Sequence, residues 1–194
     1  MDEAGRETAE QLAAIRRGDP DAFEAVAREH APSLFRVALR LTGRREEAED
    51  LVQETLVRAL PKLRGFEGRA KLATYLFRAM GNLWKNRLRS KKRSRLVDWF
   101  RAGGKREDEE GVGLDPPDHA PSPLERLEAE DRAVEVRRAV SALDPKRRLT
   151  LLLREVEEMS YEEIAEVTGV PVGTVRSRLA RAREDMRKLL GGQA

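Results

Sequence analysis

The sequence predicts an all-α protein made of two small helical domains joined by a flexible linker. Apolar residues recur with the helical period over most of the chain, and alternating patterns typical of strands are nearly absent. Charged residues make up 38% of the chain, above the globular average of about 25%, which suits helices with broad solvated faces. We place the two domains at residues 1–93 and 122–194, with the linker at 94–121.

Four helices are expected in the first domain. A short helix near residues 8–17 precedes a longer one, which begins at Asp19-Pro20 and ends at Gly43. An N-capping side chain followed by proline at the first helical position is a typical helix start. Two further helices, at about 45–63 and about 70–92, each carry an apolar stripe. Such helices can form a bundle with a modest buried core.

The linker combines glycine, proline and charged residues. Between residues 87 and 106 there are nine basic residues and one acid, and between 107 and 118 there are six acids and no base. Such a segment cannot bury enough apolar surface to fold, so we expect it to be mobile. Opposed charge blocks beneath a net charge of only +3 suggest separate surfaces for separate partners.

The second domain has the layout of a helix-turn-helix. One helix runs from the Ser122-Pro123 capping sequence to about residue 143, and another begins at Asp144-Pro145. Ser160 and Glu163 then form a capping box for a short helix, Tyr161–Thr168. Gly169 ends this helix, and a long helix continues from about residue 170 to 190. Two helices joined by such a tight turn are typical of a DNA-binding unit.

The long final helix has an apolar and a polar face. Its inward stripe is expected to comprise Val175, Leu179, Ala182, Met186 and Leu189. Its outward face is expected to comprise Arg176, Ser177, Ala180, Arg181 and Glu184. Arginine can bond two acceptors of guanine in the major groove, and serine can serve several bases or a phosphate. Arg178 and Arg183 flank this face and can pair with phosphates. The alternative is an amphipathic helix with a merely solvated basic face.

The run from Ser160 to Arg183 resembles region four of the extracytoplasmic-function (ECF) sigma factors, and residues 143–155 resemble the first half of that region. The resemblance implies a domain that binds the −35 promoter element and docks on the flap of RNA polymerase. It places the principal DNA contacts at Arg176, Ser177 and Arg181, with an apolar contact from Ala180.

A second polar stripe lies on the helix at 70–92. It comprises Arg78, Asn82, Lys85, Arg89 and Lys92. A positively charged groove that follows one backbone, with a few splayed bases, would suit such a surface. Taken alone, the stripe is more simply a solvated helix face.

Residues 19–23, 47–55 and 74–82 resemble region two of the same family. The resemblance implies that a loop and the following helix bind the unpaired −10 strand, with Phe66, Arg69 and Lys71 in the loop and Asn82 at the pocket for a flipped base. Tyr75 and Leu72 stand where the family usually has tryptophan and often phenylalanine. Gly81 also interrupts the helix, at a cost of about 1 kcal/mol against alanine.

The helix at 45–63 has an acidic outward stripe, which is by default a solvated face. Its members are Glu46, Glu49, Asp50, Gln53 and Glu54. The resemblance implies that Asp50, Gln53 and Glu54 dock on the clamp helices of the polymerase's largest subunit. Many family members also bind an anti-sigma factor. Acids beside a DNA-binding helix would repel DNA, which favours a protein partner for this face.

The chain shows no pattern of an enzyme, a metal site or a cofactor site. It has no cysteine, and His30 and His119 have no second ligand at metal-binding spacing. A phosphate-binding Gly-x-x-x-x-Gly-Lys loop is absent from the sequence. We expect no catalytic residue, no membrane insertion and a cytoplasmic location. Two alternatives stay open: a helix-turn-helix regulator that binds duplex DNA only, and an all-helical interaction protein.

Overall fold

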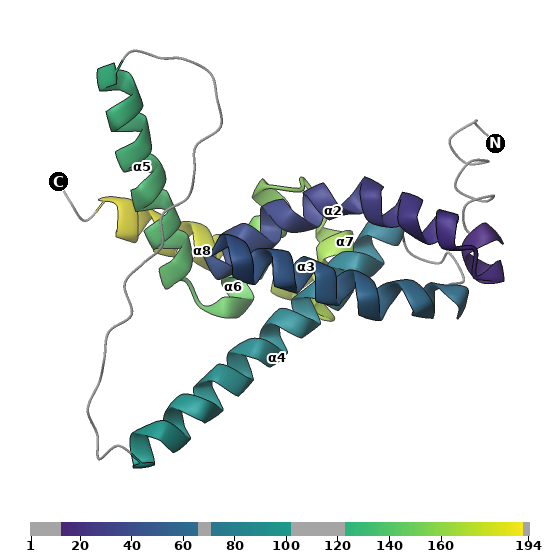
Figure 1. Ribbon diagram of the computed structural model, residues 1–194. Coiled ribbons are helices and arrows are strands. Elements are labelled where there is room, and N and C mark those ends of the chain that lie inside the picture. The colour runs from purple at the N-terminus through teal and green to yellow at the C-terminus, as the bar shows by residue number, and fades with distance from the viewer. Residues whose placement is uncertain (1–12, 66–70, 102–122, 192–194) are drawn as a thin grey trace.

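The computed structural model describes residues 13–65, 71–101 and 123–191, and every regular element within these ranges is a helix (Figure 1). The predicted all-α class is confirmed. Residues 13–17 are helical, and helix α2 follows at Pro20–Thr42. The Asp19 carboxylate accepts the backbone N–H of Asp21 at 3.0 Å, as the capping sequence predicts. Gly43 ends α2 in the left-handed region at φ 74°, a conformation that favours glycine.

The rest of the N-terminal unit (residues 13–65 and 71–101) contains α3 at Arg45–Ala59, a 3-10 segment η1 at Leu60–Gly65, and α4 at Leu72–Arg101. Helix α4 is longer than predicted, because it passes the expected end near Lys92 and continues into the expected linker. The added residues include good helix formers, and the first glycine pair of the linker comes only at 103–104.

The C-terminal unit (residues 123–191) contains α5 at Pro123–Ala142, α6 at Pro145–Glu155, α7 at Tyr161–Thr168 and α8 at Val172–Gly191. The Asp144 carboxylate caps α6 by accepting the N–H groups of Lys146 and Arg147. Both predicted ends of α7 are confirmed, with Gly169 at φ 70°.

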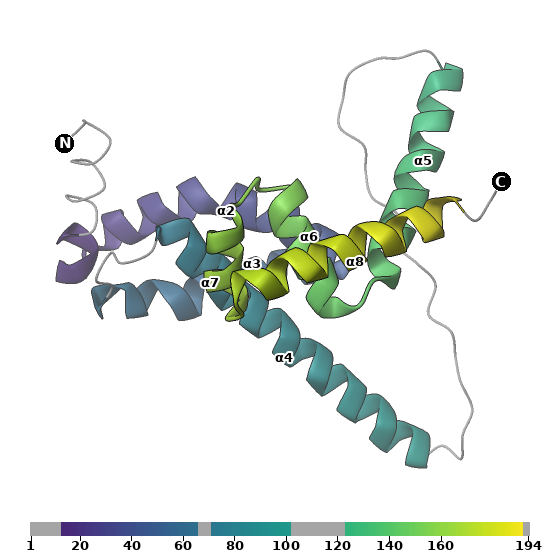
Figure 2. The same cartoon turned by 180° about the vertical axis from the view of Figure 1, so that it is seen from behind.

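The two units pack against each other. Figures 1 and 2 show α2 and α3 side by side, α4 running obliquely away from them, and α6 and α7 seated where these helices converge. Buried apolar side chains of both units belong to one continuous cluster, which includes Leu34 and Met80 from the first unit and Leu149 and Ile164 from the second. The positions of the predicted binding faces relative to one another therefore depend on this packing.

Candidate nucleic-acid and protein interfaces

The helix-turn-helix is fixed by its capping box and a small apolar core. The Ser160 hydroxyl accepts the Glu163 N–H at 3.1 Å, and the Glu163 carboxylate accepts the Ser160 N–H at 2.8 Å. Ile164, Val175 and Leu179 are almost fully buried between α7 and α8, as predicted. The backbone carbonyl of Ala165 accepts the N–H groups of Gly169 and Val170, which closes the turn between the two helices.

Helix α8 presents the predicted outward face. Its exposed side chains are Arg176, Ser177, Ala180, Arg181 and Glu184. Its inward stripe is buried at Val175, Leu179 and Ala182, and Met186 is half-buried. Leu189 was predicted to be inward, which is wrong: it is 44% exposed. The last turn of α8 projects beyond α5 and leaves the body of the unit (Figure 2).

Arg176 and Ser177 of this face each make a contact within the C-terminal unit. The Arg176 guanidinium lies 5.8 Å from the centroid of the Tyr161 ring, and Arg154 lies 5.4 Å from the same centroid. Such cation–π contacts restrict how a long side chain can move. The Ser177 hydroxyl donates to the carbonyl of Thr174 at 3.0 Å. While that bond is kept, Ser177 offers a ligand only its acceptor lone pairs. Nothing in the sequence indicated this role for Tyr161, which is the first residue of α7.

Two cations near this face have carboxylate partners within the C-terminal unit. Arg183 pairs with Glu155 at 2.8 Å, and Lys188 pairs with Glu184 at 2.8 Å. A phosphate would have to compete with these carboxylates. Arg178 is half-buried and lies close enough to Lys85 of α4 to affect its titration.

The predicted −10 surface is partly within the described residues. Phe66 and Arg69 lie outside them, as does the side chain of Lys92. On α4, Arg78, Asn82 and Arg89 are exposed and lie in one stripe, as predicted. Tyr75 is half-buried against the core, and its hydroxyl donates to the Ala59 carbonyl at 3.4 Å. The ring of Tyr75 is part of the packing, and this burial raises the pKa of its hydroxyl.

Lys71 and Lys85 are the two members of this surface that meet the C-terminal unit. The Lys71 ammonium pairs with the Glu163 carboxylate of the capping box at 2.8 Å. This hydrogen bond lowers the pKa of Glu163. Lys85 is half-buried, and its pKa is lowered first by burial and then by Arg178, Arg89, Lys146 and Arg78. Four cations from the two units thus lie near the half-buried Lys85 side chain. The sequence did not indicate this cluster, because Lys146 and Arg178 lie far from Lys85 in the chain.

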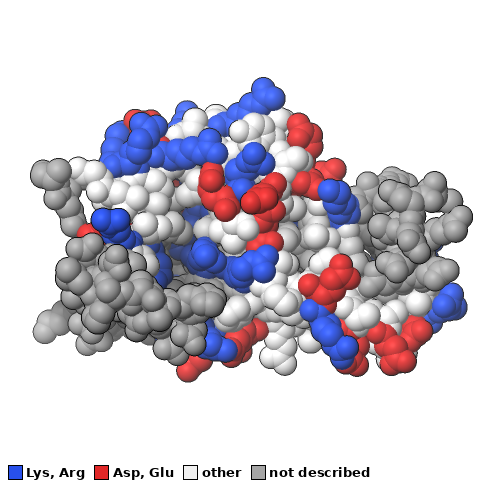
Figure 3. All heavy atoms as spheres, turned by 90° about the horizontal axis from the view of Figure 1, so that it is seen from above, with Lys and Arg blue, Asp and Glu red and all other residues white. Residues whose placement is uncertain are grey.

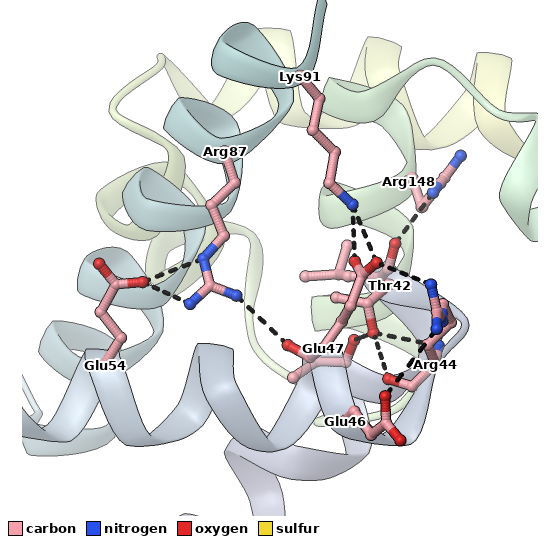
Figure 4. A network of polar contacts seen from close by, with 10 residues as sticks. Thr42, Arg44, Glu46, Glu47, Glu54, Arg87, Lys91 and Arg148 are labelled. Carbon is pink, nitrogen blue, oxygen red and sulfur yellow. Dashed lines mark hydrogen bonds and ion pairs between the residues drawn. The ribbon is translucent and has the colours of Figure 1, made fainter. Parts of the chain in front are cut away.

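The predicted protein-docking face of α3 is confirmed as exposed at Asp50 and Gln53. Glu54 does not belong to this outward stripe, which corrects the prediction. Its carboxylate turns toward α4 and accepts hydrogen bonds from the Arg87 guanidinium, with Nε at 3.0 Å (Figure 4). It also pairs with Arg58. The helical period alone did not show that an arginine 33 residues later would claim this carboxylate.

Basic and acidic side chains lie next to one another on the face seen in Figure 3, so this face has no uniform sign. Within the described ranges, no group of three or more histidine, cysteine, aspartate or glutamate side chains is arranged to hold a metal ion. Among the same residues, no helix is long and apolar enough to cross a membrane.

Comparison with known proteins matches each of the two units to a known family. Residues 26–94 match the family model for sigma-70 region 2, and residues 124–186 match the model for sigma-70 region 4. The ECF RNA polymerase sigma factor SigW of Bacillus subtilis is 30% identical over 182 residues, covering 91% of this chain and 92% of the relative. The RNA polymerase sigma-H factor of Pseudomonas aeruginosa is 34% identical over 183 residues, covering 91% and 90%.

Solved structures agree with this assignment. The chain resembles the sigma factor RpoE of Bartonella quintana, solved in complex with the anti-sigma factor NepR, with a TM-score of 0.66, 28% identity, and coverage of 90% of this chain and 97% of that one. The fold is also that of CnrH, solved in complex with the cytosolic domain of CnrY, with a TM-score of 0.66 and 23% identity. The chain therefore belongs to the sigma-70 family, as an ECF sigma factor that directs transcription initiation by RNA polymerase.

Proposed function

We propose that the chain starts transcription by dividing promoter recognition between its two units. The outward face of α8 binds the −35 duplex through Arg176, Ser177, Ala180 and Arg181, with Arg178 at its edge. The stripe on α4 binds the unpaired −10 strand through Arg78, Asn82, Lys85 and Arg89, together with the loop that carries Phe66, Arg69 and Lys71. Residues 1–93 and 122–194 act as separate binding domains, and part of 94–121 acts as the tether.

The observation that carries this proposal is the exposure of two polar faces of different chemistry, each backed by buried apolar residues. On α8, two exposed arginines and a serine stand on the far side of Val175 and Leu179. Such donors can bond base edges in the major groove. On α4, the exposed amide of Asn82 lies between basic neighbours. An amide both donates and accepts, which suits the edge of an unpaired base.

We further propose that Asp50 and Gln53 bind the polymerase and that an anti-sigma factor binds this chain, because a relative of the same fold is solved with one. No bond of the promoter changes in this mechanism. The single strand is stabilised by binding, which offsets the cost of unstacking. The site of action is then the cytoplasm, where transcription takes place.

Run-off transcription with purified core polymerase tests the proposal. The full chain should yield a product that depends on promoter sequence. A chain that binds duplex DNA but yields no such product with core polymerase would be a duplex-binding regulator instead.

Two variants separate the two faces in that assay. Arg176→Ala should weaken promoter choice at the −35 element by about 1–3 kcal/mol, and weakening by the same factor on every sequence would show a phosphate contact only. Asn82→Ala should impair strand opening, followed by permanganate reactivity, more than it impairs duplex binding. Glu166→Ala on the exposed side of α7 is a matched control for both.

A further inference from the structure

One tyrosine ring of the helix-turn-helix is shared by arginines from two helices. Tyr161 is the first residue of α7, which lies beside the N-terminal end of α8 (Figure 2). Its half-buried side chain packs against the apolar core. The guanidinium of Arg154 on α6 lies 5.4 Å from the ring centroid, and that of Arg176 on α8 lies 5.8 Å from it. The ring therefore links α6 to the face of α8 that carries the proposed −35 contacts.

Arg154 is the more firmly held of these two arginines. It is half-buried, and its Nη1 donates to the carbonyl of Met159 at 2.8 Å and to that of Glu158 at 3.4 Å. Both carbonyls belong to the segment between α6 and α7, and Met159 itself is only 6% exposed. Backbone groups thus hold Arg154 against the ring, and Arg154 in turn keeps the ring in place.

Arg176 has the opposite surroundings. Its side chain is exposed, and no carboxylate or carbonyl within the described ranges pairs with it. The Tyr161 ring is therefore the group that orients Arg176 in the free protein. Arg181 lies further along the same face and is also exposed, but no aromatic ring in the described part of the chain lies beside it. The proposed −35 face thus has one arginine that a ring orients and one that no ring orients.

The hydroxyl of Tyr161 has a different neighbour from its ring. The pKa of Arg183 is raised first by its hydrogen bond to Glu155 and more weakly by Tyr161. Removing the hydroxyl would therefore affect Arg183, whereas removing the ring would affect Arg154 and Arg176. The two parts of the side chain can be tested separately.

The orientation of Arg176 matters because of the geometry of base reading. In a helix-turn-helix, the N-terminal residues of the second helix contact base edges in the major groove. A guanidinium reads guanine through two parallel hydrogen bonds, so its plane has to match that of the base. Ordering a mobile arginine side chain on binding lowers the affinity. A ring that orders Arg176 beforehand reduces this loss for the base that matches its orientation, and a mismatched base gains nothing from it.

We propose that Tyr161 is a positioning residue for base reading, whose ring holds the Arg176 guanidinium in the orientation that its −35 base pair requires. Tyr161 sets the specificity of this contact through Arg176, while Arg154 fixes the ring from α6. The inference rests on the proposed function, because it takes α8 as the helix that reads the −35 element. It adds that discrimination at the base pairs read by Arg176 depends on a side chain of α7.

Promoter variants test the proposal in the complete system. The full chain with core polymerase is titrated in run-off transcription on promoters in which each −35 base pair is replaced in turn. Arg176→Ala and Arg181→Ala identify the base pairs that each arginine discriminates. Tyr161→Leu should lower discrimination about two- to tenfold at the base pairs read by Arg176 and leave those read by Arg181 unchanged. Uniform weakening on every promoter, or an equal loss at both sets of base pairs, would overturn the proposal.

Two further variants show whether Tyr161 acts through Arg176. Tyr161→Phe keeps the ring and loses only the hydroxyl, so it should retain wild-type discrimination. In the Arg176→Ala background, Tyr161→Leu should change discrimination no further, because substitutions that act through one contact are not additive. The proposal is wrong if Tyr161→Phe loses as much discrimination as Tyr161→Leu, or if the two substitutions in the double variant have additive effects.

The mobility of Arg176 in the free chain gives a readout that needs neither DNA nor polymerase. NMR relaxation of the arginine Nε–Hε groups should show Arg176 more restricted than Arg181 in the wild type, and as mobile as Arg181 in Tyr161→Leu. Equal mobility in the wild type would overturn the proposal even if Tyr161→Leu failed to fold, which circular dichroism checks. If the wild type gives no promoter-dependent product, the proposed function fails, whereas the relaxation result still decides whether the ring orders Arg176.

Discussion

Helix α4 has two neighbours that hold it in different ways. Toward α3 it is held by complementary charges: Arg87 donates to Glu54, and Lys91 pairs with Glu47 (Figure 4). Arg87 also donates to the backbone carbonyl of Asp50. Toward the C-terminal unit it offers a buried glycine and an aromatic ring, and its cations there meet other cations. The charges of α4 that face α3 are paired with opposite charges. Those near Lys85, on the side of the C-terminal unit, lie close to other positive charges.

The difference indicates which interface is permanent. Breaking the α3 side would leave a carboxylate and a guanidinium without their partners, which is costly for partly buried groups. Parting the C-terminal side would return Lys85 to water and relieve repulsion, at the expense of apolar burial. It would also break the ion pairs Arg36–Glu157 and Lys71–Glu163 and the hydrogen bond from Arg148 to the Leu41 carbonyl. The N-terminal bundle should therefore move as one body, and the C-terminal unit should be the part that separates from it.

The largest effect is expected on the permanent side. Arg87→Ala should lower the free energy of unfolding of the N-terminal bundle by about 2 kcal/mol, because it removes charge-assisted hydrogen bonds at a partly buried site. Urea unfolding followed by circular dichroism measures it. Arg89→Ala, an exposed arginine on the same helix, is the control and should change stability by less than about 0.5 kcal/mol. An equal loss of unfolding free energy in both variants would contradict the view that the pairing of Arg87 stabilises the α3 side of α4.

Arg148→Ala should open the separable side. It removes the hydrogen bond to Leu41 and the cation beside Trp84, and the loss of a buried hydrogen bond of about 1 kcal/mol corresponds to about a fivefold larger open fraction. In a Trp99→Phe background Trp84 is the only tryptophan, and its emission should shift to the red. Arg147→Ala, which breaks a pair with Asp185 inside the C-terminal unit, is the control. A red shift of the same size in the control would contradict the prediction.

Glu157 of the C-terminal unit pairs with Arg36 of α2 at 3.1 Å, and it should give the packing of the two units a pH dependence. Burial is the largest cause of its raised pKa, which exceeds the opposing effects of Arg36 and Arg40. A carboxyl group whose folded pKa lies above its unfolded value stabilises the packed state most at low pH, and this contribution is lost as the pH rises through the folded pKa.

Glu157→Gln should therefore raise the packed fraction at neutral pH and flatten its change with pH above about 4.3, the ordinary value for glutamate. Distances between spin labels at Val57→Cys on α3 and Leu190→Cys on α8, two exposed positions, measure it when they are recorded between pH 4.5 and 7.5. Glu158→Gln on the neighbouring exposed residue should leave the profile unchanged. A steeper profile in Glu157→Gln than in the wild type would refute the assignment.

The smallest effect is expected at Lys85. Lys85→Met keeps the apolar stem and removes the charge, so the open fraction should fall about twofold and its salt dependence should change, because salt screens the repulsion that the lysine contributes. Lys62→Met on η1 is an exposed control. Distances recorded at low and high salt test it, and a packed fraction lower than that of the wild type would show that Lys85 attracts the C-terminal unit instead.

Local signals in the sequence were sufficient for the helix-turn-helix. Ser160 and Glu163 fix the start of α7, and Gly169 fixes its end, because capping and left-handed backbone are decided within a few residues of chain. The outward face of α8 follows from the helical period in the same way. The family assignment also came from contiguous motifs, which need no tertiary information.

The residues that the sequence misplaced or left unexplained depend on distant partners. Glu54 had the spacing of an outward acid, yet Arg87 draws it inward. Leu189 had the spacing of a core residue, yet it is exposed, because the end of α8 extends beyond the helices that would cover it. Gly81 had only an unfavourable helix propensity in the sequence, whereas in the structure the side chain of Leu149 packs against it.

The sequence by itself determined the helices, their caps, the two polar faces and the family. Only the tertiary structure decided which side of α4 is satisfied and which is strained by like charge. Periodicity specifies the direction of a side chain on its own helix, whereas the packing of a neighbour and the sign of its charge depend on residues brought together by folding.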